Sequence, residues 1–150
     1  MISRSSISEF LSHKNIAVVG VSRNVKKFGN AVFKELKNKG YQVFPVNPYI
    51  KEFEGEKCYP DLGTLSGKAE SAVIIAAPYV TEKTVEDAVS AGIKNIWIQQ
   101  GAESDRAVSY CKENNMNVIY GECILMFAEP AAFFHRAHRF VNGVFGKLPM

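Results

Sequence analysis

The chain contains the segment Ile16-Ala-Val-Val-Gly20-Val-Ser-Arg-Asn24-Val-Lys-Lys-Phe-Gly29, from which its architecture can be inferred. The first residues are apolar and end at Gly20, a polar and basic loop follows, and Gly29 begins a helical pattern. A buried strand that leads into a helix through such a loop is typical of α/β proteins with a phosphate site at the helix start.

The loop of this segment has the chemistry of an anion site. Backbone N–H groups and the positive end of the following helix would face the anion, and Arg23, Lys26 and Lys27 add full charges. The loop differs from the dinucleotide fingerprint G-x-G-x-x-G, because Ser22 and Val25 occupy the positions of its second and third glycines. We therefore expect a phosphorylated ligand on a Rossmann-like frame, held by a variant loop.

Five apolar runs rich in β-branched residues predict strands over 16–19, 41–46, 72–76, 95–98 and 117–120. Continuous hydrophobicity indicates strands that are covered on both faces, as in a parallel sheet. The segment 48–68 is expected to be a long crossover with only a turn or two of helix. Right-handed crossovers then predict a single α/β domain over 1–150, a Rossmann-like doubly wound parallel five-stranded sheet in the order 3-2-1-4-5, with helices on both faces. A short helix over 6–12 precedes the sheet, and another over about 130–142 follows it.

Composition narrows the class of protein. With 47% hydrophobic and 22% charged residues the chain has the make-up of a soluble globular domain. Its net charge of +3 is too mild for the broad basic surface of a nucleic-acid binder, and no apolar run is long enough to span a membrane. The N-terminal region lacks the apolar segment of a signal peptide, and Cys58, Cys111 and Cys123 have no metal-ligand spacing. We therefore expect a cytoplasmic protein with free thiols that binds neither nucleic acid nor membrane.

The end of the second predicted strand indicates which ligand is held. Open parallel sheets bind ligands outside the carboxyl ends of their strands, and an NAD site places an Asp or Glu after the second strand. Here Val46-Asn47-Pro48 stands at that point, and the next acid is Glu52. Because a carboxylate would repel a phosphorylated ribose, its absence beside the three loop cations favours NADP or coenzyme A. The first loop does not separate the two.

Six parts of the chain, in order over roughly residues 8–128, match one family. They are Val19-Gly-Val-Ser-Arg-Asn24 with Lys26-Lys-Phe-Gly29, Gly40-Tyr-Gln-Val-Phe-Pro-Val-Asn-Pro48, Ala76-Ala-Pro-Tyr-Val-Thr81, Ala91-Gly-Ile-Lys94, Ile98-Gln-Gln-Gly101 and Gly121-Glu-Cys123. In these parts the chain resembles the small CoA-binding domain proteins, whose fold is that of the N-terminal domain of the succinyl-CoA synthetase α subunit. The resemblance implies a CoA-type ligand with its phosphates at the first loop.

The resemblance also implies roles for individual residues. Ser22, Arg23 and Lys26 match the part that contacts the CoA phosphates. The residues after the second strand lie beside the adenosine in that family, and those after the third border the point where the pantetheine arm leaves the ADP. The implied ligand contacts are Gly20, Ser22, Arg23, Asn24 and Lys26 in the first loop, Asn47 and Pro48 after the second strand, Pro78 and Tyr79 after the third, and Ile98, Gln99 and Gln100 at the end of the fourth.

Structural roles are open for some residues at these strand ends. Asn47 can bind the ligand or shape the turn before Pro48, and we give these roles equal weight. Thr81 is expected to cap the helix that follows Pro78. Cys123 has no histidine partner in sight and is expected to be a buried or half-buried structural thiol.

The resemblance does not carry catalysis with it. The synthetase α subunit continues into a second domain with a phosphorylated histidine, which His13, His135 and His138 of this chain do not replace. We therefore predict a CoA or acyl-CoA binding protein with no evident catalytic site and no metal, active as a monomer or homodimer. The alternatives are an NADP-dependent oxidoreductase, or a CoA-sensing regulatory module that acts through a protein partner.

Overall fold

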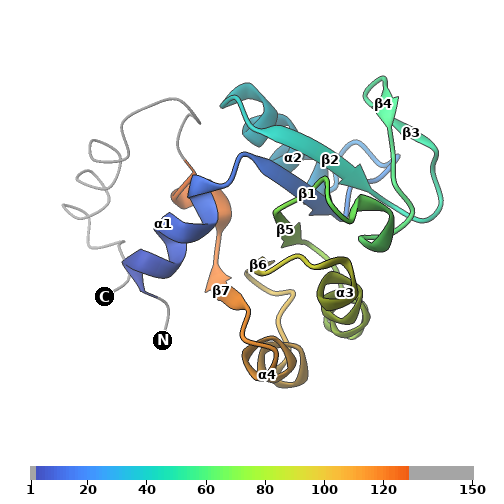
Figure 1. The fold of residues 1–150 in the computed structure, drawn as a ribbon. Helices are drawn as coiled ribbons and strands as arrows, with labels where there is room; N and C mark the ends of the chain where they lie inside the picture. Colours follow the sequence, from blue (N-terminus) through green and yellow to red (C-terminus); the bar gives the residue numbers. More distant parts are fainter. Residues whose placement is uncertain (1–2, 129–150) are drawn as a thin grey trace.

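The computed structural model describes residues 3–128, in which helices alternate with strands along the chain (Figure 1). The helices are α1 (Arg4–Ser12), α2 (Phe28–Asn38), α3 (Pro78–Ala91) and α4 (Asp105–Glu113), and the 3-10 turns are η1 (Gly63–Leu65) and η2 (Ile124–Met126). The strands are β1 (Asn15–Val19), β2 (Gln42–Val46), β3 (Glu52–Phe53), β4 (Glu56–Lys57), β5 (Ser71–Ile74), β6 (Asn95–Gln99) and β7 (Asn117–Glu122). The helix expected over 130–142 lies outside the described residues. Within those residues, no helix combines the length and the apolar character that a membrane span requires.

The main sheet has five parallel strands in the spatial order β2-β1-β5-β6-β7, and β3 and β4 form a separate antiparallel hairpin. Helices α1 and α2 cover one face of the sheet, and α3 and α4 cover the other (Figure 1). Side chains alternate between the two cores, so Trp97 packs on the α1 and α2 side while Ile96 and Ile98 pack on the α3 and α4 side. This double burial explains the continuous apolar runs, and it confirms the Rossmann-like α/β class with helices on both faces.

The order of the strands corrects the prediction. Counted along the chain, the five strands lie in the order 2-1-3-4-5 and not 3-2-1-4-5, because β5 pairs with β1 on the side away from β2. Pro45 supplies the physical reason, since proline has no N–H to donate to a neighbouring strand and is tolerated on an edge strand, where that position faces outward. The outer edge of β2 is met by Tyr59, whose N–H donates to the Pro45 carbonyl at 2.9 Å and whose carbonyl accepts from Asn47 N at 2.9 Å. From β1 the chain first builds β2 on one side and then returns to build β5 on the other side. The order of strands therefore reverses between β1 and β5.

The crossover from β2 to β5 contains the β3–β4 hairpin and the single turn η1. The single turn agrees with the expected turn or two of helix, whereas the hairpin was not predicted. The hairpin is held against α2. Lys34 and Lys37 of the helix pair with Glu54 and Glu56 of the hairpin, and the Phe33 and Phe53 rings meet edge to face, 5.0 Å apart.

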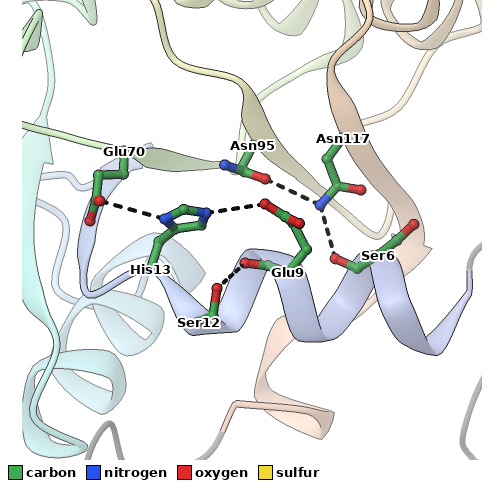
Figure 2. A network of polar contacts seen from close by, with 7 residues as sticks. All are labelled: Ser6, Glu9, Ser12, His13, Glu70, Asn95 and Asn117. Atoms are coloured by element: carbon green, nitrogen blue, oxygen red, sulfur yellow. Dashed lines mark hydrogen bonds and ion pairs between the residues drawn. The ribbon is translucent and has the colours of Figure 1, made fainter.

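Polar contacts fasten α1 at the amino edge of the sheet (Figure 2). Asn117 Nδ2 donates to the Ser6 carbonyl at 2.9 Å and to Asn95 Oδ1 at 3.3 Å. The His13 ring lies between two carboxylates, 3.4 Å from Glu9 and 3.5 Å from Glu70. These residues tie α1 to the starts of strands, so this edge of the sheet has a structural role and the opposite edge is left for a ligand.

Candidate functional site at the carboxyl edge of the sheet

A cleft of about 350 Å³ opens at the carboxyl edge of the sheet, where the chain order reverses between β1 and β5. The end of β1, the start of α2, residues 75–77 after β5 and residues 99–102 at the end of β6 line it. This is the position at which doubly wound sheets bind their ligands. Of the predicted contacts, Gly20, Gln99 and Gln100 line this cleft.

Two glycines let α2 begin directly on the end of β1. A Cβ on Gly29 would lie 2.2 Å from the Gly20 carbonyl oxygen, and a Cβ on Gly20, whose φ is +126°, would lie 2.1 Å from the Ile75 carbonyl oxygen. Neither position has room for a side chain, so the start of α2 lies close to the end of β1, and the end of β1 lies close to that of β5. Backbone rather than side chains therefore forms this wall of the cleft.

Both helices that begin beside the cleft start without a side-chain cap. Lys27 is the N-cap of α2 and Ala77 that of α3, and neither side chain caps the first turn. The expected cap by Thr81 is wrong, because its Oγ1 donates one turn back, to the Ala77 carbonyl at 3.3 Å. The positive ends of α2 and α3 thus face the edge of the sheet with no side chain satisfying them.

The loop between β1 and α2 carries uncompensated positive charge. Arg23, Lys26 and Lys27 are exposed, and the ion pairs found among the described residues include none of the three. One guanidinium nitrogen of Arg23 donates to the Tyr49 carbonyl at 3.1 Å, which holds the loop close to the end of β2. The loop thus retains cationic groups that can pair with phosphate oxygens.

Asn47 is committed to the fold, which favours the turn role over ligand contact. Its Nδ2 donates to the Val21 carbonyl at 2.7 Å, and its Oδ1 accepts from Tyr49 N at 2.7 Å. Pro48, the next residue, lines a second hollow of about 240 Å³ that is mainly apolar and reaches from the ends of β1 and β2 to α3. The two predicted residues after β2 thus have different placements.

The end of β6 supplies a buried amide. Gln99 is 5% exposed, and its Oε1 accepts from Ile124 N at 3.1 Å. The hydrogen bonds of the described residues give no acceptor to its amide nitrogen, which leaves a donor beside the cleft. Gln100 is exposed and lines the cleft, whereas Ile98 is fully buried in the core and does not.

Exposed apolar side chains gather at the same edge. Tyr79, at the start of α3 beside Pro78, is 77% exposed. All the large exposed hydrophobic residues in the described part of the chain follow the carboxyl ends of strands of the main sheet. They are Val25, Phe28, Tyr49, Tyr79, Val80 and Met126. Apolar groups around a cleft with a few polar donors are typical of a small-molecule site.

The three cysteines of the chain lie in different surroundings. Burial raises the pKa of the Cys58 thiol, and it raises the pKa of Cys111 to about 11, so both stay protonated at neutral pH. Cys123 is partly exposed and lines a hollow of about 320 Å³ next to Gln100 and Glu122. It is a free, half-buried thiol, as expected from the sequence.

Asn30 is the site residue that the sequence reasoning missed. It lies in the first turn of α2, is 4% exposed, and bonds the loop at Ser22 and Asn24. In the sequence it is one more polar residue after Gly29, and only the fold brings its amide against a loop that precedes it.

Known proteins resemble this chain in both sequence and structure. Residues 14–129 match a family model described as a CoA binding domain. The uncharacterized protein YneT of Bacillus subtilis is 30% identical over 123 residues, which are 81% of this chain and 91% of YneT. The α subunit of ADP-forming acetate–CoA ligase II from Pyrococcus furiosus is 29% identical over 126 residues, which are 77% of this chain but only 28% of that subunit.

Solved structures show the same division between small proteins and parts of large ones. A conserved hypothetical protein from Pyrococcus furiosus superposes with a TM-score of 0.72 at 38% identity, covering 75% of this chain and 97% of its own. A hypothetical protein from Pyrococcus horikoshii has a TM-score of 0.77 at 32% identity, with 83% and 88% covered. The dinucleotide-forming acetyl-coenzyme A synthetase 1 of Ca. Korarchaeum cryptofilum has a TM-score of 0.66 at 27% identity, covering 75% of this chain and 27% of the synthetase. The chain therefore belongs to the CoA-binding domain family.

Proposed function

We propose that this chain is a cytoplasmic protein that binds coenzyme A or an acyl-CoA, with the ligand's phosphates at the β1–α2 loop and its pantetheine arm along the cleft. One observation carries the proposal. The uncapped start of α2 and Lys27 line a cleft at the point where the chain order reverses, directly after a loop that carries the further cations Arg23 and Lys26.

The residues present fit a phosphorylated nucleotide. Gly20 and Gly29 keep side chains away from the helix start, so backbone donors remain open to an anion. The charges of Arg23, Lys26 and Lys27 would complement phosphate oxygens, which accept strong charge-assisted hydrogen bonds. The residues directly after β2 include no carboxylate before Glu52, while Asp61, Asp87 and Lys83 line the hollow beside Pro48.

The rest of the ligand has matching surfaces at the same edge. The apolar hollow beside Pro48 would receive the adenine base, and the exposed ring of Tyr79 would cover the ligand from α3. The free amide nitrogen of Gln99 would donate to a carbonyl of the pantetheine arm, because that arm carries two amides.

The proposed role is binding of the ligand without catalysis. The ligase activity in the names of the relatives belongs to proteins of which this chain spans 28% or less, and the cleft offers no activated nucleophile. The CoA-binding family match favours CoA over NADP as the ligand. The chain would act alone, as a homodimer, or as a CoA-sensing module for a protein partner.

Isothermal titration of the purified, ligand-free chain with CoA, 3′-dephospho-CoA, NADP and NAD tests the proposal. We expect CoA to bind and 3′-dephospho-CoA to bind more weakly. In the double variant Arg23→Ala with Lys26→Ala, the free energy of CoA binding should weaken by several kcal/mol at most, since hydrogen bonds to charged groups contribute about 1.5–3 kcal/mol each. A wild-type chain that binds NADP and not CoA would sink the proposal.

A matched control separates the site from general charge effects. Lys14 and Lys94 are exposed and directly precede β1 and β6, so they lie at the amino edge, away from the cleft. Replacing both with alanine removes the same two charges and should leave the CoA affinity unchanged. If it weakens binding as much as the loop variant does, the phosphates are not held at the β1–α2 loop.

A further inference from the structure

We propose that Asn30 is a positioning residue that sets the β1–α2 loop for an anion, by pairing one group of loop amides internally and leaving another group free. The inference rests on the proposed function, in which the anion is a phosphate of the CoA ligand. It assigns the anion contacts to particular backbone amides, and Arg23 is the one loop residue indicated by the sequence that contributes such an amide.

The side chain of Asn30 is devoted to the loop. Its Oδ1 accepts from Ser22 N at 2.8 Å, while its Nδ2 donates to the Ser22 carbonyl at 2.8 Å and to the Asn24 carbonyl at 3.1 Å. Because Asn30 is 4% exposed and sits in the first turn of α2, these bonds fix the loop relative to the helix start. From the other side, Asn47 Nδ2 holds the Val21 carbonyl at 2.7 Å.

These bonds divide the backbone amides of the loop. Ser22 N is taken by Asn30, Asn24 N donates to Ser22 Oγ at 3.1 Å, and Lys26 N donates to Asn24 Oδ1 at 3.1 Å. Lys27 N donates to the Asn24 carbonyl at 3.0 Å. The hydrogen bonds of the described residues do not use the amides of Arg23, Val25, Phe28 and Gly29.

The free amides are those that an anion needs. Amides that alternate along a loop and continue into the first turn of a helix can face one anion together, and the helix dipole favours negative charge there. The predicted contacts Ser22, Asn24 and Lys26 have backbone amides that are already paired, so of these three only side chains remain for the ligand. The amides of Arg23 and Val25 take their place.

A second group indicates that a ligand is bound at this place. Gln99 lines the same cleft as Phe28 and Gly29, is 5% exposed, and has an amide nitrogen without an acceptor among the hydrogen bonds of the described residues. Among the described residues, the buried side-chain atoms that lack a hydrogen-bond partner do not include this nitrogen, so it is open to the cleft and can donate to a ligand acceptor there. Phe28 and Gly29 thus border the same cavity as this side chain, while Arg23 and Val25 lie in the loop that leads to it.

The first test compares Asn30 variants by titration with CoA. We expect Asn30→Ala to weaken binding about tenfold or more, because the loop loses three hydrogen bonds that hold its shape. Asn30→Asp keeps an acceptor for Ser22 N, but it loses both donated hydrogen bonds and adds a negative charge. Its CoA affinity should therefore fall at least as much as that of Asn30→Ala. If both variants bind CoA like the wild type, the inference is overturned.

Asn117→Ala is the matched control for a merely structural role. Asn117 also donates two hydrogen bonds, to Ser6 and Asn95, but at the amino edge (Figure 2). The variant should lower the unfolding midpoint and keep the CoA affinity within about twofold, since the bonds it loses lie far from the loop. If affinity simply follows stability across all variants, Asn30 has no positioning role.

The second test reads the amides directly by ¹⁵N NMR, with CoA and inorganic pyrophosphate as separate probes. We expect the largest shifts at the amides of Arg23, Val25, Phe28 and Gly29, and slow hydrogen exchange of the Ser22 amide that becomes fast in Asn30→Ala. Shifts centred on Ser22, Asn24 and Lys26 would overturn the inference. If pyrophosphate shifts the expected amides while CoA does not bind, the loop inference holds and the proposed function fails. If neither probe binds, both fail.

Discussion

At the scale of single residues, Cys111 links burial to pH. Its side chain is fully buried under α4, and burial raises the pKa of its thiol from 9.0 to about 11. The native state therefore favours the protonated thiol more than the unfolded state does. This contribution to stability is complete below pH 9, where the unfolded thiol is also protonated, and it is lost as the pH rises towards 11.

We therefore expect the free energy of unfolding of the wild type to fall between pH 9 and 11 by roughly 2–3 kcal/mol more than that of Cys111→Ala, since one pKa unit corresponds to about 1.4 kcal/mol. Urea denaturation of both proteins across this range measures the difference. Other groups titrate equally in both, so parallel curves would show that Cys111 does not carry the effect.

The sequence predicts those features of the candidate site that depend only on residue type and on position relative to a strand end. The cations of the first loop and the missing carboxylate after β2 are visible directly, because their meaning depends on the strand end at which they stand. The role of Asn30 depends on distances to Ser22 and Asn24, which the sequence does not contain. Asn47 is ambiguous for the same reason, since both of its possible roles place an amide in a turn.

At the scale of elements, the contact between β1 and α2 depends on Gly29. In Gly29→Ala the new Cβ would lie 2.2 Å from the Gly20 carbonyl, so the helix start must move. We expect a loss of about 1–3 kcal/mol in the free energy of unfolding, as for other overpacked sites, together with weaker CoA binding. Urea denaturation and titration calorimetry on the same preparations measure the two effects.

Gly63→Ala is the control for this prediction. A Cβ there would meet only Asp61 Oδ1, at 3.3 Å, and the backbone of η1 does not require a glycine conformation. This variant should be close to the wild type in both stability and affinity. Equal effects of the two substitutions would mean that the close approach at Gly29 is not what holds α2 in place.

The five strands of the main sheet are predictable, because double burial leaves continuous apolar runs whose ends the sequence places within two residues, whereas the short strands β3 and β4 have no such run and were missed. Their order is not fixed by the apolar pattern, since the orders 3-2-1-4-5 and 2-1-3-4-5 both satisfy right-handed crossovers. Pro45 is the signal that separates them. A proline in the second strand makes that strand an edge, and only the order 2-1-3-4-5 places it there.

At the scale of the whole molecule, the ligand edge is assembled from strand ends that are far apart in the chain. Gly20 and Gln99 line one cleft at this edge, and Pro48 lines the neighbouring hollow, only when β1, β2, β5 and β6 are all paired in one sheet. A ligand that binds this edge therefore binds the native state and not the unfolded chain. Binding must then stabilise the entire fold by mass action.

We expect CoA at a hundred times its low-salt Kd to raise the free energy of unfolding by about 2.7 kcal/mol. At the same CoA concentration the gain should shrink as salt is added, because exposed loop cations are screened over about a Debye length. The variant Arg23→Ala with Lys26→Ala should show a smaller gain and a weaker salt dependence. Urea denaturation with and without CoA measures this gain for the wild type and for the double variant, each at low and at high salt. If the CoA-induced gain in the free energy of unfolding of the wild type does not respond to salt, the charges of Arg23 and Lys26 do not hold the phosphates. The binding energy would then come from the apolar hollow and the uncharged donors of the cleft.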